Sequence, residues 1–95
     1  MSTLHIVSCS PQSAATLSSL RRLLGPDDGI LLTGDGVYAG VQPATGLTAP
    51  LYALKPDVIA RGLQSLWPDS IQLIDHAGYV DLCVRYDKSL NWSAA

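Results

Sequence analysis

Four short apolar runs recur along the chain, at residues 4–8, 30–33, 51–54 and 71–74. Runs of this length bounded by glycine, proline or aspartate are typical of strands. The run at 30–33 is apolar up to its last residue, as expected of a strand covered on both faces, so this strand is predicted to be central. A last edge strand is expected at residues 89–92.

A helical signal follows the first strand. Ser13 is a candidate N-cap, and apolar residues then recur at helical spacing in Leu17, Leu20 and Leu24. The Gly-Pro pair that follows ends this amphipathic helix, and an Asp-Asp-Gly turn leads into the second strand.

Three further helical segments are expected. A short one covers residues 37–41, and another has Pro56 near its first position and stops at Gly62. Asp75 is predicted to cap the last helix, which runs from about residue 77 to residue 86.

Strands that alternate with helices, joined by connections too long for hairpins, favour parallel pairing. The sequence therefore predicts a small α/β fold, a mostly parallel sheet of four to five strands with helices on both faces. We expect a single domain over residues 1–95, because the chain contains no internal repeat, low-complexity segment or linker.

The last predicted helix is apolar around much of its circumference, with only Asp81 and Arg85 on its polar side. We expect such a helix to be covered on two sides, by the sheet and then either by a partner or by the chain's own core. Tryptophan is enriched at interfaces, but Trp67 can also be a core residue. The interface candidates are Tyr79, Val80, Cys83, Tyr86 and Trp92.

Composition supports the expectation of a partner. The chain is 47% hydrophobic and only 15% charged, with a mean hydropathy of +0.22, so some apolar surface should remain outside the core. The net charge of −2 gives no excess of Lys and Arg, which argues against direct binding of nucleic acid.

The sequence shows no targeting or membrane signal. Its N-terminus has neither a basic region nor a long apolar run, and glycine, aspartate and proline interrupt every apolar stretch. We therefore expect a cytoplasmic protein, with no membrane partner, in which Cys9 and Cys83 are thiols.

The two cysteines differ in their expected chemistry. Cys9 follows the first strand and precedes a helix, whose backbone N–H groups would favour a thiolate, so it is the better candidate for a reactive thiol. The alternative is a small semi-buried residue at a strand end. Cys83 shares an arc of the last helix with Tyr79 and Tyr86, which predicts a buried and inert thiol.

Gly34, Asp35 and Gly36, followed by Tyr38, resemble the start of a phosphate loop. The longer glycine spacing of such loops is missing, and Asp35 would repel a phosphate at short range. We interpret the segment as a tight strand-to-helix turn that needs positive φ at one or both glycines. A ligand-binding module built on residues 34–38 remains an alternative.

The two histidines carry no recognisable catalytic pattern. His5 lies within the first strand and His76 at the start of the last helix, and neither belongs to an HxxxH, CxxC or nucleophile signature. The sequence thus predicts no catalytic residue, no metal and no cofactor.

Several segments together resemble the TusB/DsrH family. They are Leu-Arg-Arg-Leu-Leu-Gly at 20–25, Leu-Leu-Thr-Gly-Asp-Gly-Val-Tyr-Ala at 31–39, Leu-Tyr-Ala-Leu at 51–54, Ala-Arg-Gly-Leu at 60–63 and Ile-Asp-His-Ala-Gly-Tyr-Val-Asp-Leu at 74–82. The resemblance rests on their order and spacing, covers nearly the whole chain and implies a DsrE-like fold.

The resemblance implies a non-catalytic subunit of a cytoplasmic sulfur-relay complex of the TusBCD type, a dimer of heterotrimers. Its partners would be TusC-like and TusD-like subunits, with TusA and TusE reached indirectly through the complex. Such a complex passes persulfide sulfur toward 2-thiolation of the tRNA wobble uridine. In the family, the main sulfur-carrying cysteine belongs to the TusD/DsrE subunit.

One position separates two branches of the family. Members from sulfur oxidisers carry a cysteine in the first helix, where this chain has Leu20, give or take one residue. Because a persulfide carrier needs an accessible thiolate, the absence of this cysteine favours the tRNA-thiolation branch. The alternatives are a DsrEFH-type sulfur-trafficking subunit of sulfur oxidation and a persulfide carrier that uses Cys9.

Overall fold

Five strands form one sheet in a computed structural model that describes residues 2–8, 20, 22–41 and 49–92. The sheet order is β4-β3-β2-β1-β5, and every neighbouring pair is parallel. The predicted parallel α/β sheet, with the second strand at its centre and the last at an edge, is confirmed. The strands are β1 (Thr3–Val7), β2 (Gly29–Leu32), β3 (Leu51–Leu54), β4 (Gln72–Ile74) and β5 (Lys88–Trp92).

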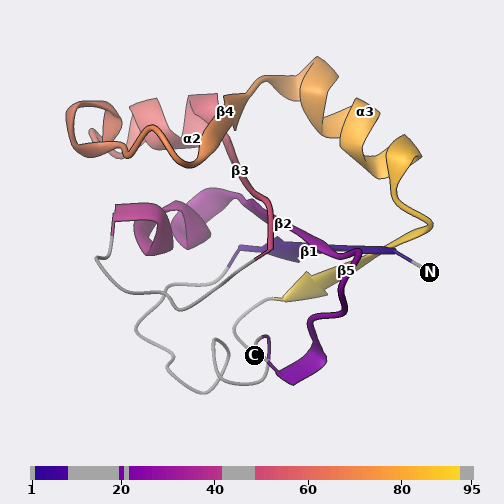
Figure 1. Cartoon of the computed structure of the whole chain (residues 1–95). Coiled ribbons are helices and arrows are strands. Elements are labelled where there is room, and N and C mark those ends of the chain that lie inside the picture. Colours follow the sequence, from indigo (N-terminus) through magenta and orange to yellow (C-terminus); the bar gives the residue numbers. More distant parts are fainter. Residues whose placement is uncertain (1, 9–19, 21, 42–48, 93–95) are drawn as a thin grey trace.

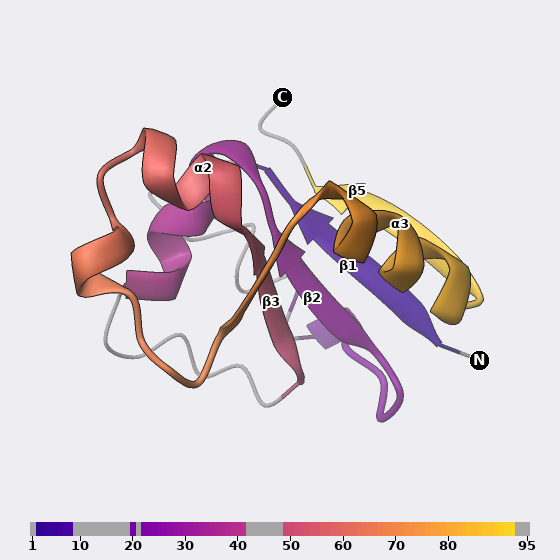
Figure 2. The ribbon, with the colours of Figure 1, turned by 90° about the horizontal axis from the view of Figure 1, so that it is seen from above.

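The two faces of the sheet carry separate cores, because side chains alternate along each strand. On one face, Leu4, Ile6 and Leu31 pack with Leu82 of α3 (His76–Arg85). On the other, strand residues such as Ile30 and Leu32 belong to a larger cluster. Figures 1 and 2 show α3 lying along one side of the sheet. The larger cluster also takes in Leu20, Val37 of the 3-10 helix η1 (Gly34–Val41) and Val58 of α2 (Lys55–Ala60).

β3 runs directly into α2, as the sequence predicts. Pro56 occupies the first turn of α2, where a missing N–H is no loss and the fixed φ suits a helix. The helix ends before Gly62, whose φ of +67° is a conformation that glycine adopts without strain. A single 3-10 turn, η2 (Gln64–Leu66), then leads toward β4.

α3 begins with the predicted cap. The Asp75 carboxylate accepts a hydrogen bond from the Gly78 backbone N–H at 2.8 Å, which satisfies one of the unpaired donors of the first turn. Arg85 lies in the last turn, where its charge suits the helix dipole. No helix in the described part of the chain has the length and apolar character needed to cross a membrane.

Most of the helix expected at residues 13–24 lies outside the described residues, as do Cys9 and most of the loop after η1. Two described positions fit the amphipathic pattern: Leu20 is fully buried and Arg22 is exposed. The alternative in which the chain's own core covers the second side of α3 is wrong, because Val80 and Val84 are 60% and 78% exposed.

Candidate functional site

The carboxyl ends of β1, β2 and β3 meet where the sequence places candidate chemistry. The Thr33 N–H donates to the Val7 carbonyl at 3.0 Å, and the Gly34 N–H donates to Asp57 Oδ2 at 2.9 Å. Gly34 has a φ of +51°, so one of the two glycines adopts the expected positive φ. Gly36 does not, and is required instead because a Cβ there would collide with the Val7 carbonyl oxygen.

Asp35 is paired with an arginine, and this pairing decides what the turn can bind. Its Oδ1 accepts from Arg61 Nε at 3.1 Å and lies 3.1 Å from Arg61 Nη2. Asp57, which holds the Gly34 N–H, lies 3.9 Å from the same guanidinium. Carboxylates of the chain already accept from the Gly34 N–H and the Arg61 guanidinium, so these donors are not free to bind an anion. We call this group of Asp35, Asp57 and Arg61 the clasp, because it links the turn after β2 to α2. Tyr38, in η1, is 38% exposed.

The candidate interface residues of α3 divide between its two sides. Tyr79, Cys83 and Tyr86 pack partly buried against the Leu4, Ile6 and Leu31 core. Cys83 is therefore half-buried rather than fully buried as predicted. Val80 and its neighbour Val84 point the other way and form an exposed apolar ridge, beside the ion pair of Asp81 and Arg85 at 3.6 Å.

The Tyr86 side chain lies against Gly29, the first residue of the central strand β2. A Cβ on Gly29 would overlap the Tyr86 hydroxyl, so glycine at this position makes room for the phenol. Burial, with a smaller contribution from the neighbouring Tyr52, raises the pKa of Tyr86 above its ordinary value. The Tyr86 side chain therefore contributes to the packing of this chain's own core.

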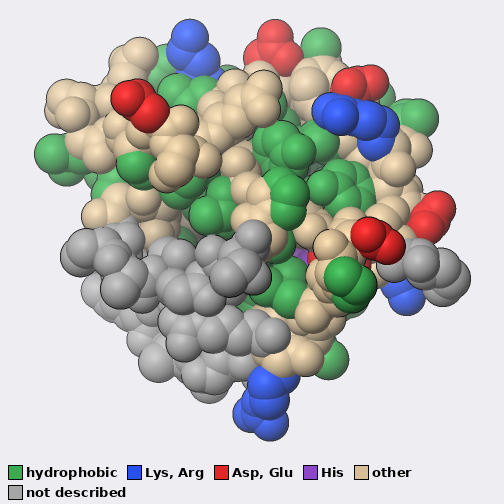
Figure 3. Space-filling view, in the orientation of Figure 1, with side chains coloured by type: hydrophobic (Ala, Val, Ile, Leu, Met, Phe, Trp, Pro, Cys, Tyr) green, Lys and Arg blue, Asp and Glu red, His purple; other side chains and the backbone are tan. Residues whose placement is uncertain are grey.

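Trp92 lies on the opposite face from the α3 candidates. It packs against the larger core cluster, and its indole N–H donates to His5 Nδ1 at 3.0 Å. The structure therefore does not bring Trp92 together with Tyr79, Val80, Cys83 and Tyr86 into one patch. Figure 3 shows hydrophobic side chains at several places on one face of the molecule, with charged groups scattered between them.

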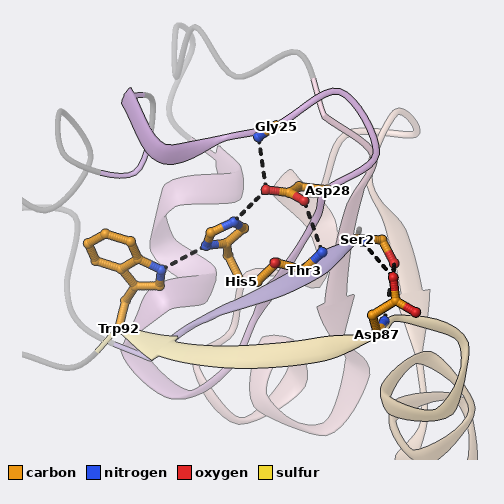
Figure 4. A network of polar contacts seen from close by, with 7 residues as sticks. All are labelled: Ser2, Thr3, His5, Gly25, Asp28, Asp87 and Trp92. Atoms are coloured by element: carbon orange, nitrogen blue, oxygen red, sulfur yellow. Dashed lines mark hydrogen bonds and ion pairs between the residues drawn. The ribbon is translucent and has the colours of Figure 1, made fainter.

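Sequence reasoning missed a buried polar network that extends from Asp28, before β2, through His5 of β1 to Trp92 of β5 (Figure 4). His5 Nε2 lies 3.0 Å from Asp28 Oδ2. The Asp28 carboxylate also accepts from the Thr3 N–H at 2.9 Å and the Gly25 N–H at 2.8 Å. Since the Trp92 indole can only donate, His5 Nδ1 must accept, which assigns the proton of the neutral ring to Nε2.

The environment of Asp28 explains its charge. Burial by itself would raise its pKa, but the hydrogen bonds from Gly25, His5 and Thr3 outweigh burial and hold the pKa below its ordinary value. Both ring nitrogens of His5 are engaged in this network, so the ring is a structural group rather than a free base. His76 is exposed on the first turn of α3.

Comparison with known proteins identifies the relatives of this chain. The family model described as "DsrH like protein" matches residues 9–89. Protein TusB of Pectobacterium carotovorum is 38% identical over 94% of this chain and 99% of its own length. Protein TusB of Yersinia pestis is 40% identical with the same coverage of both chains.

Two solved structures share the fold. The ychN protein of E. coli superposes with a TM-score of 0.70 at 17% identity, over 97% of this chain and all of the other. Protein Tm0979 of Thermotoga maritima gives a TM-score of 0.70 at 24% identity, over 86% of this chain and 91% of the other. At these identities the two structures support the fold alone.

Proposed function

This chain belongs to the TusB/DsrH family of sulfur-relay proteins, and on that premise we propose that it is a non-catalytic subunit of a cytoplasmic complex of the TusBCD type. The complex would pass persulfide sulfur toward 2-thiolation of the tRNA wobble uridine. TusC-like and TusD-like subunits would be its direct partners, and TusA and TusE would act on it through the complex. The observation that carries the proposal is the match to TusB proteins over 94% of the chain.

The surface of α3 supports the role of a subunit. Val80 and Val84 are β-branched apolar residues that stand 60% and 78% exposed, one helical turn apart. Such a ridge gains stability when a neighbouring protein covers it. The salt bridge between Asp81 and Arg85 borders the ridge and could supply the polar rim of an interface.

No cysteine stands at residues 19–21, and this supports a non-catalytic role in this branch. The resemblance matches Leu20, give or take one residue, with the cysteine of members from sulfur oxidisers. In this chain Leu20 is fully buried in the larger core. A side chain in that environment is packed for stability, whereas a sulfur carrier needs an exposed thiolate.

Native mass spectrometry of the chain co-expressed with the TusC-like and TusD-like subunits of its host tests the proposal. We expect a mixed assembly in which the mass of an extra sulfur atom appears on a partner and not on this chain. If the chain fails to assemble with these subunits, the proposal is wrong. Val80→Asp with Val84→Asp should weaken assembly, and Leu66→Asp is the control, because Leu66 is comparably exposed on η2.

A second measurement separates the subunit role from sulfur transfer by this chain. In cells that carry Cys9→Ser, the fraction of 2-thiolated wobble uridine should match the wild type. Cys83→Ser serves as the matched control, since it removes the other thiol of the chain. Loss of thiolation in Cys9→Ser alone, with the assembly intact, would replace the subunit role by that of a persulfide carrier.

A further inference from the structure

Within the described residues, β5 forms an edge of the sheet with no strand on its outer side. Among the described strands it pairs only with β1, and its residues Lys88, Ser89, Leu90 and Asn91 are all exposed. The opposite edge is the three-residue strand β4, which is too short to offer much pairing. Long exposed edges attract another strand, and proteins usually protect them. We propose that a second copy of this chain docks here, by antiparallel pairing of β5 with β5 of the partner copy about a twofold axis.

The backbone of β5 determines which groups are available for this pairing. The Lys88 N–H donates to the Ser2 carbonyl at 3.3 Å, and the Ser8 N–H donates to the Trp92 carbonyl at 3.0 Å. Polar groups of Lys88 and Trp92 therefore point toward β1. Because this direction alternates along a strand, the N–H and C=O groups of Ser89 and Asn91 point outward.

These outward groups fit a twofold axis through Leu90. In an antiparallel pair centred there, Ser89 lies opposite Asn91 of the second copy, and these two residues exchange both backbone hydrogen bonds. Leu90 then lies opposite its own copy in a non-hydrogen-bonded pair, the arrangement in which side chains come closest. A twofold axis through Ser89 or Asn91 would pair fewer residues of β5. An axis that passes between two residues would place a residue whose backbone N–H and C=O point outward opposite one whose N–H and C=O point toward β1.

The side chains of β5 are complementary in this register. Lys88 lies opposite Trp92 of the second copy, where the ammonium group can approach the indole ring. Leu90, which is 45% exposed, gains an apolar contact with its equivalent, and Ser89 meets Asn91 as a hydrogen-bonding pair. No residue meets a like charge. A twofold contact requires this kind of self-complementarity, in which each residue and its opposite exchange roles.

The contact involves only the chain and its own copy, so it can be present whether or not the chain is a sulfur-relay subunit. The surface differs from the Val80 and Val84 ridge of α3, which the proposed function assigns to other subunits. A failure of one interface can thus be distinguished from a failure of the other. Both sheets would join into one continuous sheet across the axis.

Single cysteine variants of the full chain test the register. Leu90→Cys places two thiols at directly opposed positions of a non-hydrogen-bonded pair, whose Cα separation of about 4.5 Å suits a disulfide. Ser89→Cys places its two thiols diagonally, at about 7–8 Å, beyond the usual range. Under mild oxidation we expect a disulfide-linked dimer with Leu90→Cys and only wild-type background with Ser89→Cys, with the linked residue identified by peptide mass spectrometry.

Equal cross-linking of the two cysteine variants, or none, overturns the proposal. A Leu90→Cys chain that links only to a co-expressed partner subunit also overturns it, because the occupant would then be a different protein. The unmodified chain is the reference for linkage through its natural cysteines, Cys9 and Cys83.

A backbone variant gives an independent test. Asn91→Pro removes an outward N–H but none of the groups that face β1, whereas Asn91→Ala keeps that N–H. In sedimentation velocity the wild type and Asn91→Ala should reach twice the mass of the 10.1 kDa chain, and Asn91→Pro should stay at that mass. A wild type that remains monomeric at every concentration overturns the proposal, and the cysteine pair decides the matter if Asn91→Pro does not fold.

Discussion

Two of the polar side-chain networks in the described part of the molecule, that of His5 and Asp28 and that of Asp35 and Arg61, differ sharply in burial. His5 and Asp28 are 2% and 6% exposed, and every hydrogen-bonding atom of the Asp28 carboxylate has a partner within the fold. In the clasp at the carboxyl ends of the strands, the Asp35 side chain is 62% exposed and that of Arg61 is 25% exposed. The same kinds of groups stabilise a fold strongly only where water cannot replace a lost partner.

Asp28→Ala should give the largest effect. The change leaves the N–H groups of Thr3 and Gly25 and the His5 ring without their buried acceptor, which should lower the free energy of unfolding by about 3–5 kcal/mol. Urea denaturation followed by circular dichroism measures it. A loss below about 1 kcal/mol would mean that water or a neighbouring group replaces the carboxylate, and would remove the contrast between the networks.

Acid should weaken the buried network in a way that depends on the Asp28 charge. Folding lowers the pKa of Asp28 below its ordinary value of 3.8, so near and below that pH the unfolded chain binds more protons than the folded chain. The stability that Asp28 contributes is therefore present above pH 3.8 and is lost as the pH falls through the lower folded pKa. Urea titrations at a series of acidic pH values measure this loss.

Asp28→Asn provides the control for the acid effect. Asparagine keeps the shape of the side chain but cannot ionise, so the variant should be less stable at neutral pH and should lose less stability on acidification. If the wild type and Asp28→Asn lose the same free energy of unfolding on acidification, the loss is due to the other carboxylates.

Trp92→Phe should cost less than loss of Asp28. The ring packing is largely kept, but His5 Nδ1 loses the indole N–H that it accepts from, with an expected loss of about 1–2 kcal/mol. Thermal melting of the two proteins side by side measures it. Trp67→Phe is a matched control, since the indole N–H of Trp67 donates to a backbone carbonyl, that of Ile71, at 3.1 Å.

Arg61→Ala should have the smallest effect. Exposed ion pairs contribute about 0–1 kcal/mol, and salt screens them. We expect a loss within that range that shrinks further in high salt, as read from urea denaturation at two ionic strengths. A loss as large as that of Asp28→Ala would show that the clasp, despite its exposure, holds the fold.

Local sequence patterns predicted the parts of the fold that depend on neighbours along the chain. The apolar runs at β2 and β3, the Pro56 helix start and the Asp75 cap are all confirmed, because each depends on residues within one or two turns. The strand-to-helix turn at Gly34 was predicted with its positive φ for the same reason.

Long-range partners could not be predicted in this way. Asp28 lies in an Asp-Asp-Gly segment that indicates a turn, and its partner His5 is 23 residues away. Trp92 is 87 residues from His5, and Arg61 is 26 residues from Asp35. The only signal in the sequence was that Asp28 is a polar residue next to the buried strand β2. This position indicates neither the hydrogen-bonding partner of Asp28 nor the direction of its side chain.

The place of β5 beside β1 has a consequence for how the chain folds. The two strands pair residues that lie 85 positions apart in the sequence, such as Thr3 with Lys88. β1 therefore leaves the protein-synthesis machinery long before the strand that completes its pairing, and one of its edges stays uncovered through most of translation. A parallel ladder of such high contact order forms slowly, so the newly made chain is most prone to aggregation during this interval.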